Sequence, residues 1–268
     1  MPATPAPTPT AVPTDTAAPP KSRAAARAVL KTEARLFLRE PGSLFWILVF
    51  PTLLLVILGL IPSFREANPS MGGRRIIDLY VPVALLLAAI TTGIQVMPAV
   101  LTGYRERGIL RRMSTTPVRP AALLGAQITL HGAATVVSMT LALAVGRLAF
   151  GVALPEQLAG YVLAAFLTLC SALAVGCLLC ALSPTTKAAS VAGSAVFFPM
   201  MFTAGVWGPV QAMPDMLQQI VQLLPFGAAS QALNQAASGH WPGWSHLAVL
   251  AVWTLVLGWV ARRRFRWE

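Results

Sequence analysis

Residues 158–182 read LAGYVLAAFLTLCSALAVGCLLCAL, a stretch without a single charged side chain. A helix rises about 1.5 Å per residue and needs about 20 apolar residues to cross the hydrocarbon core of a bilayer. Each charge at the bilayer centre would cost about 2.5–3.5 kcal/mol on insertion scales. The stretch therefore predicts a transmembrane helix.

Further segments on both sides of this stretch share its character. Each is predominantly apolar and contains no Asp, Glu, Lys or Arg. They lie at residues 44–61, 79–101, 121–146, 188–207 and 247–261. The last is the shortest, and Trp244, His246 and Arg262 are expected to anchor its ends. We therefore predict an all-α integral membrane protein with six transmembrane helices.

The composition agrees with a membrane protein. Hydrophobic residues make up 56% of the 268 residues and charged residues only 11%, whereas a soluble domain usually has about 25% charged residues. No separate soluble enzyme domain fits around the apolar segments. The net charge of +11 is gathered in short clusters between them. Membrane topology and anionic lipid head groups account for such clusters better than nucleic acid does.

The positive charges predict the orientation, because cytoplasmic segments of membrane proteins are enriched in Lys and Arg. With the N-terminus in the cytoplasm, 16 of the 20 basic residues lie on cytoplasmic segments. Only Arg65, Arg74, Arg75 and Arg147 remain on the opposite side. Both termini are therefore predicted to be cytoplasmic, which requires an even number of crossings.

The N-terminal region divides into two parts. Residues 1–21 are rich in Pro, Ala and Thr and predict a disordered tail. Residues 22–40 predict an amphipathic helix along the membrane surface, with basic residues every four positions, at Arg23, Arg27, Lys31, Arg35 and Arg39. A solvated basic leader is the alternative. Residues 41–268 then form the transmembrane domain.

Residues 208–240 are moderately apolar and are broken by three prolines. Apolar residues recur there as on one face of a helix that is too short to cross the bilayer. A crossing would also place the Arg-rich C-terminus outside. We predict a re-entrant pair of short helices in the outer leaflet.

Motifs for chemistry are absent from the sequence. There is no G-x-x-x-x-G-K-[ST] phosphate loop and no H-E-x-x-H zinc motif. Cys177 and Cys180 formally match C-x-x-C, but no basic residue stands beside them to lower a thiol pKa and no second pair completes a zinc site. We expect Cys170, Cys177 and Cys180 to be packing residues, and we predict neither a catalytic residue nor a metal site.

Polar residues within the predicted spans are candidates for a substrate path. They are Thr91, Thr92, Gln95, Gln127 and His131. An ionisable residue at membrane depth, such as His131, is a functional candidate by default. The alternative is hydrogen bonding between helices, which is the more common role of such residues.

The cytoplasmic segment 103–120 combines charge with apolar residues. Its first part predicts a short helix suited to docking on a partner protein. The docking residues would be Arg105, Glu106, Arg107, Gly108, Ile109, Leu110, Arg111, Arg112 and Met113. An ordinary positively charged cytoplasmic loop would need the arginines but not the apolar residues.

Two stretches resemble a known family. GYRERGILRRMSTTPVRPAALLGAQ (103–127) fits an E-R/K-x-G-x-L-x-R/K-L-x-x-x-P pattern, with Met113 where Leu is usual. FFPMMFTAGVWGPVQAMPDMLQQIVQLLPFGAASQAL (197–233) fits an F-x-x-G-x-x-x-P-x-x-x-M-P pattern through Phe202, Gly205, Pro209, Met213 and Pro214, followed by Leu224 and Pro225. Together they resemble the ABC-2 type permeases, and most closely the daunorubicin-resistance type.

The resemblance implies a permease of the bacterial plasma membrane, but the family includes exporters of drugs, lipids, haem and polysaccharides, so it does not fix the substrate. We expect a drug or a lipid-like substrate that is moved outward. The resemblance implies a second copy of the permease and a separate ABC ATPase subunit, which would bind ATP and Mg²⁺ because this chain has no phosphate loop. It also assigns the exit region to Gly205, Pro209, Met213, Pro214 and Pro225. A polysaccharide or lipid-linked glycan exporter, a membrane-embedded lipid-modifying enzyme and a transporter that works alone are the alternatives.

Overall fold

The computed structural model describes residues 22–69, 73–109, 112, 120–208, 210 and 213–264. Within them, helices account for almost all regular structure, and Ala67 and Arg75 form an isolated β-bridge. The helices are α1 (Ser22–Phe37), α2 (Pro41–Leu44), η1 (Phe45–Val49), α3 (Phe50–Gly59), α4 (Pro62–Arg65), α5 (Ile76–Ile90), η3 (Thr91–Val96), α6 (Met97–Glu106), α8 (Pro120–Phe150), α9 (Leu158–Leu182), α10 (Thr186–Thr203), α11 (Asp215–Gln222), α12 (Pro225–Ala237) and α13 (Trp244–Arg264).

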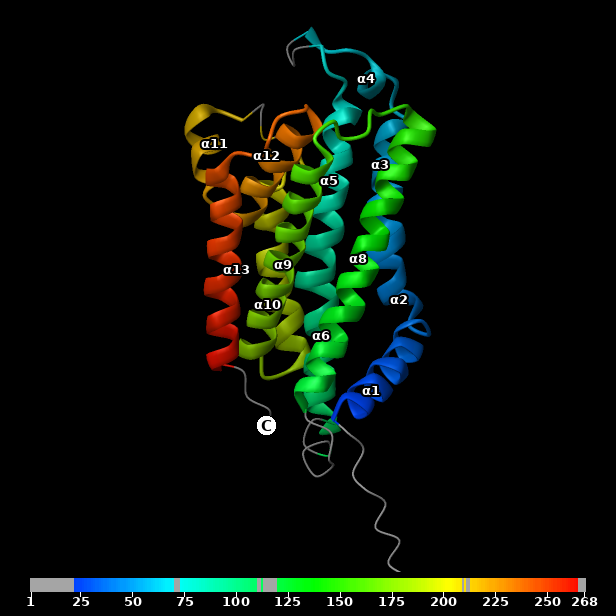
Figure 1. Cartoon of the computed structure of the whole chain (residues 1–268), viewed down its shortest axis with the longest axis vertical. Helices are drawn as coiled ribbons and strands as arrows, with labels where there is room; N and C mark the ends of the chain where they lie inside the picture. The colour runs from blue at the N-terminus through cyan, green and yellow to red at the C-terminus, as the bar shows by residue number, and fades with distance from the viewer. Residues whose placement is uncertain are drawn as a thin grey trace, which may run out of the picture.

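Several helices join end to end into long rods (Figure 1). The described residues contain 5 rods long and apolar enough to cross a membrane. They are Pro41–Gly59, Ile76–Glu106, Ala121–Phe150, Leu158–Leu182 and Trp244–Arg264. The protein is thus an all-helical, multi-pass membrane protein.

Five of the six predicted spans correspond to these rods. The segment expected to be shortest, 247–261, extends to the 21 residues of α13. The sixth, 188–207, forms α10, which has 18 residues and is not among the five. Thr185 caps the start of α10, where its hydroxyl oxygen accepts a hydrogen bond from the Ala188 N–H at 3.1 Å. Lys187 therefore lies in the first turn of α10.

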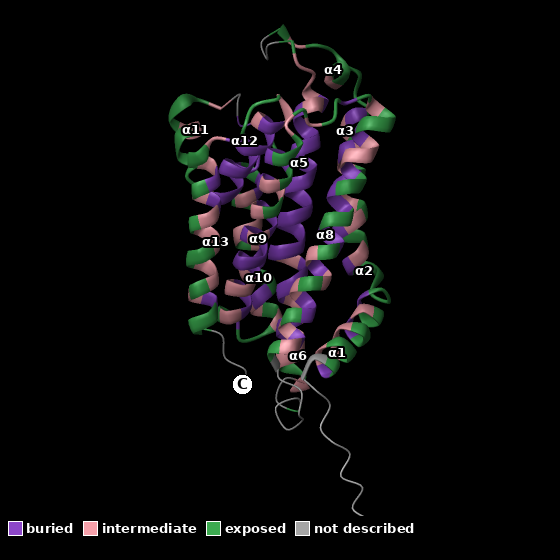
Figure 2. Cartoon of the chain, viewed as in Figure 1, coloured by how far each residue is buried: buried purple, intermediate pink, exposed green. Residues whose placement is uncertain are grey.

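The rod made of α5, η3 and α6 lies at the centre of the bundle. In the most apolar 18-residue stretch of this rod, 78% of the residues are buried, whereas 17% are buried in the corresponding stretch of α13. Figure 2 shows the same contrast between α5 and the exposed outer side of α13. That outer side carries Val252, Leu255 and Trp259, which are all more than half exposed. A continuous apolar exterior of this kind suits contact with lipid.

A π-helical turn, η1, precedes Pro51 in the first rod. Proline has no N–H, so Pro51 interrupts the backbone hydrogen bonds of this turn. The Ser138 hydroxyl of α8 donates a hydrogen bond to the Ile47 carbonyl oxygen in the turn at 2.6 Å. This contact between helices supplies a donor to the interrupted backbone, as membrane proteins require.

The second rod has the same design at η3, which precedes Pro98. Here α9 comes close enough that a Cβ on Gly176 would overlap the carbonyl oxygen of Gly93. A Cβ on Gly193 of α10 would lie 2.8 Å from the carbonyl oxygen of Ile94 in the same turn. Glycine at these positions lets α9 and α10 pack directly on the widened turn.

The two ends of the bundle differ (Figure 1). The helix α1 lies at one end, together with the C-terminal ends of α6 and α13, while α4, α11 and α12 lie at the other. At that second end, Arg75 pairs with Asp78 at 2.7 Å and donates to the carbonyl oxygens of Phe150 and Gly151. The hydrogen bond to Asp78 holds the pKa of Arg75 above its ordinary value. These contacts tie the start of α5 to the end of α8.

The region 208–240 contains two short helices, α11 and α12. Almost every residue of α12 is buried, and Figure 1 shows it between the ends of α5, α9 and α13. The α11 helix covers it with Val221 and exposes Met216 and Ile220. The indole N–H of Trp253 on α13 donates to the Leu223 carbonyl oxygen at 2.9 Å, which fixes the end of α11.

Candidate functional site

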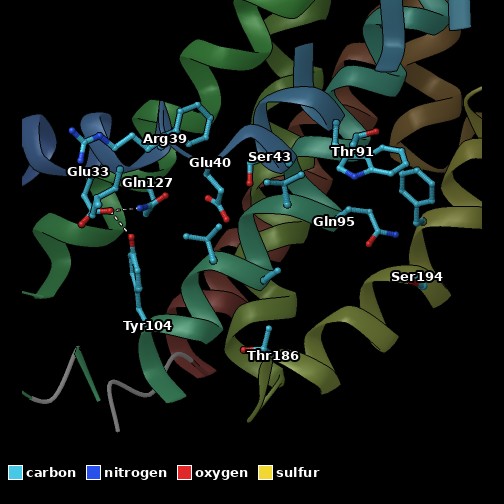
Figure 3. Close-up of a pocket in the computed structure, with 18 of the residues that line it drawn as sticks. Glu33, Arg39, Glu40, Ser43, Thr91, Gln95, Tyr104, Gln127, Thr186 and Ser194 are labelled. Atoms are coloured by element: carbon cyan, nitrogen blue, oxygen red, sulfur yellow. Dashed lines mark hydrogen bonds between the residues drawn. The ribbon is translucent and has the colours of Figure 1, made fainter. Parts of the chain in front are cut away.

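A cavity of about 910 Å³ opens near the end of the bundle that carries α1 (Figure 3). Its walls come from α1 and the turn after it, α2, η1, η3, α6, α8 and α10. The lining residues are Glu33, Leu36, Phe37, Arg39, Glu40, Gly42, Ser43, Trp46, Thr91, Gln95, Val96, Ala99, Val100, Tyr104, Arg107, Gln127, Thr186, Ser194, Phe197 and Phe198.

The lining combines aromatic surface with a few polar groups. Trp46 stands on one wall, and Phe197 and Phe198 stand on the α10 wall. Gln95 and Ser43 add an amide and a hydroxyl (Figure 3). Pockets for drug-sized molecules usually measure about 300–1,000 Å³ and combine apolar walls with a small number of polar groups. The cavity can therefore hold an amphipathic molecule of that size.

A buried carboxylate closes one end of the cavity. Glu33 on α1 is only 8% exposed. One of its oxygens accepts hydrogen bonds from the Tyr104 hydroxyl of α6 at 2.7 Å and from the Gln127 amide of α8 at 2.6 Å (Figure 3). These two hydrogen bonds hold α1 against both α6 and α8.

The polar residues predicted to line a substrate path divide into two groups. Thr91, Gln95 and Gln127 line the cavity. Thr92 is fully buried and donates to its own helix, at the Ala88 carbonyl oxygen, 2.7 Å away. His131 is also fully buried; its Nδ1 lies 2.9 Å from the Gln127 carbonyl oxygen and its ring packs edge-on against Phe37. Neither of these two residues lines the cavity.

Within the segment expected to dock on a partner, the first two residues bind inside the protein. The segment begins in a helix, because α6 continues to Glu106. The Arg105 guanidinium donates to the carbonyl oxygens of Ser183 at 2.9 Å and Cys180 at 3.0 Å, at the end of α9. The Glu106 carboxylate accepts from the N–H of Thr186 at 2.9 Å and from its hydroxyl, at the start of α10.

Both charges suit the helix ends that they meet. A cation at a helix C-terminus and an anion at a helix N-terminus each interact favourably with the helix dipole. Arg105 and Glu106 are neighbours in sequence, so α6 places one charge on α9 and the other on α10. We call the connected residues 180–186 the α9–α10 turn. The end of α6 therefore holds this turn in place.

The residues after Glu106 leave the helix at a glycine. Gly108 has a φ of 66°, in the left-handed region that ends many helices. Arg107 lies over the Tyr104 ring, with 5.6 Å from its guanidinium carbon to the ring centroid. Ile109 is half-buried, and Arg112 donates to the Arg107 carbonyl oxygen at 3.2 Å. Leu110, Arg111 and Met113 lie outside the described residues.

The predicted exit residues mark the ends of helices. Gly205, with a φ of 83°, follows α10, and Pro214 immediately precedes α11. Met213 is half-buried in the connection between them. Pro225 is buried as the first residue of α12. Pro209 lies outside the described residues.

Glu33, the acidic residue at the end of the cavity, was not among the site residues predicted from the sequence. Glu33 interrupts the stripe formed by Val29, Leu30 and Phe37, the side of α1 that packs on the bundle. An acidic residue on an otherwise apolar helix face is the signal that could have found it.

In the described part of the chain, no three His, Cys, Asp or Glu side chains gather as a metal site would require. The fold and the cavity together define a multi-pass, all-helical membrane protein with a large chamber beside its central rod. The family model for ABC-2 type transporters matches residues 24–236, and the chain belongs to this family. Its members are transport membrane subunits, and they usually work with an ATPase subunit. A comparison with curated proteins finds no match.

Proposed function

We propose that this chain is the permease subunit of an ATP-driven exporter that moves a hydrophobic or amphipathic, drug-like or lipid-like substrate out of a bacterial cell. The observation that carries the proposal is the cavity of about 910 Å³, which reaches Thr186 of the α9–α10 turn and Tyr104, the residue before Arg105. A binding chamber and the contacts of the docking segment therefore share one end of the molecule.

Orientation follows from charge in this proposal. The end that carries α1, the docking segment and Arg262–Arg264 faces the cytoplasm, because Lys and Arg concentrate there. Substrate then enters the cavity from the cytoplasm or the inner leaflet and leaves past α11 and α12. With α10 as a sixth crossing, both termini are cytoplasmic.

The energy comes from a partner in this proposal. Two copies of the chain dock on two ABC ATPase subunits, which bind ATP and Mg²⁺, through residues 103–120. A push on the docking segment moves α6, and Arg105 and Glu106 pass the movement to α9 and α10 through the hydrogen bonds described above. Because Thr186 and Phe197 of α10 line the cavity, its shape changes with that movement.

Co-purification and efflux test the proposal together. A tagged chain is expressed with a candidate ABC ATPase, and the purified complex is assayed for ATPase content and for ATP-dependent transport of a hydrophobic fluorescent dye in vesicles. We expect the ATPase to be retained and transport to stop when its phosphate-loop lysine is replaced. Dye transport by the chain alone, driven by an ion gradient, would identify a secondary transporter instead.

A further inference from the structure

The helix α1 presents two opposite faces with different chemistry. One face packs on the bundle through Ala25, Glu33 and Phe37, which are all buried. The other carries Arg27, Lys31 and Arg35, spaced four residues apart and all exposed. We call these three residues the basic stripe. A spacing of four residues on a helix places them along one side over about 12 Å.

The basic stripe has no partner of opposite charge in the described part of the chain. The ion pair found there joins Arg75 and Asp78 at the far end of the bundle. Glu33, the acidic residue within α1, lies on the other face and accepts hydrogen bonds from Tyr104 and Gln127. The charges of the stripe are therefore available to an external anion.

The position of α1 indicates where that anion is. Only three residues, 38–40, separate α1 from the membrane-spanning rod that starts at Pro41. From Phe37 to Pro41 the chain can cover at most about 14 Å. Leu38, directly after the end of α1, is 69% exposed next to this rod. The stripe is therefore close to the lipid head groups, with an apolar side chain that can enter the interface.

We propose that the basic stripe is a binding site for anionic phospholipid head groups of the cytoplasmic leaflet. Acidic lipids attract basic segments next to a membrane, by about fivefold in affinity for each Lys or Arg near the surface. The proposal rests on the orientation given under Proposed function. It goes further by assigning the α1 stripe to a specific lipid class. The exposed Leu38 and the short connection to the first membrane-spanning rod favour a lipid surface over an acidic protein segment.

The test uses the full chain with its three cysteines replaced by Ala and Ala28→Cys introduced. Ala28 is exposed beside the stripe, so an environment-sensitive fluorophore placed there reports contact with lipid. The chain is reconstituted in vesicles of phosphatidylcholine with increasing phosphatidylglycerol. Protection of the fluorophore from a water-soluble quencher is measured at low and high salt. Thermal unfolding confirms that each variant is folded.

We expect protection to grow with phosphatidylglycerol and to weaken at high salt, because surface charge is screened by salt. R27Q/K31Q/R35Q should weaken the apparent affinity for phosphatidylglycerol by about 100-fold at low salt, from three residues of about fivefold each. The matched control, R262Q/R263Q/R264Q, removes three exposed charges at the same end of the bundle. It should leave protection unchanged.

Three results would overturn the proposal. They are equal protection in phosphatidylcholine alone, an equal loss in the α13 control, and protection that appears only when an ABC ATPase is added. The assay contains no substrate and no ATP. A failure to export or to bind an ATPase would therefore disprove the proposed function without changing the measured lipid protection. A loss of lipid protection would likewise disprove the lipid site without changing the result of the export experiment.

Discussion

The carboxylate of Glu106, the last residue of α6, accepts hydrogen bonds from both the N–H and the hydroxyl of Thr186, the first residue of α10. The two residues are 80 positions apart in the sequence. Glu106 was expected to orient a partner protein, and the structure gives it an internal partner. It is therefore a positioning residue for α10.

Glu106→Ala should loosen the start of α10 and lower ATP-dependent export while the ATPase remains bound. Thr186→Val should have a similar but smaller effect, because it retains the N–H that donates to Glu106. The double variant should be no worse than Glu106→Ala alone, since both changes remove one interaction. Thermal unfolding and dye efflux are measured for all three. Strictly additive losses would show that Glu106 acts elsewhere.

Leu110→Asp should release the ATPase from the purified complex, because a docked Leu contributes about 1.5–3 kcal/mol through burial. Leu110 lies outside the described residues, so this expectation comes from the sequence. Leu154→Asp is the matched control, since Leu154 is exposed in the connection after α8. ATPase retention on the tagged chain is the measurement. Normal retention in Leu110→Asp would make the segment an ordinary cytoplasmic loop.

Thr91→Val and Thr92→Val form a matched pair of neighbouring, nearly isosteric changes. Thr91 lines the cavity, and its buried hydroxyl bonds to no group among the described residues, whereas the Thr92 hydroxyl bonds within its helix. Thr91→Val should therefore change the apparent KM for the transported dye, and Thr92→Val should leave it unchanged. Equal effects on both would indicate that the cavity does not hold the substrate.

Ser138→Ala should destabilise the protein by about 1–3 kcal/mol, because it leaves the buried Ile47 carbonyl without a donor. Pro51→Ala in the same chain should recover part of the loss by returning an N–H to the helix. Thr140→Ala on the exposed side of α8 is the control. Unfolding in detergent is measured, and the absence of recovery in the double variant would show that the Ser138 hydrogen bond does not compensate for the N–H that Pro51 lacks.

Gly176→Ala should destabilise the bundle by about 1–3 kcal/mol through overpacking, because its Cβ would overlap the Gly93 carbonyl oxygen. Gly258→Ala on α13 meets no neighbouring atom within 4 Å and should be neutral or slightly stabilising. The yield of folded protein and the unfolding temperature are compared. A well-folded Gly176→Ala would mean that α9 and η3 are further apart than described.

The sequence by itself determined that the chain is helical and lies in a membrane. The stretch 158–182 is observed as α9 with those same bounds. Apolar length decides this property locally, because any helix of that composition is more stable in lipid than in water. The basic leader likewise predicted the helix now seen as α1. The family patterns at 103–127 and 197–233 pointed to the family that the family model shows.

Only the tertiary structure decided what the polar residues do. Thr91 and Thr92 are adjacent and chemically identical, yet one lines the cavity and the other bonds within its helix. In the sequence, Glu33 is one charged residue among several in the basic leader. In the structure, Tyr104 of α6 and Gln127 of α8 donate hydrogen bonds to it. A polar side chain in a membrane protein is placed by the neighbouring helix that satisfies it, and packing between distant segments determines which helix that is.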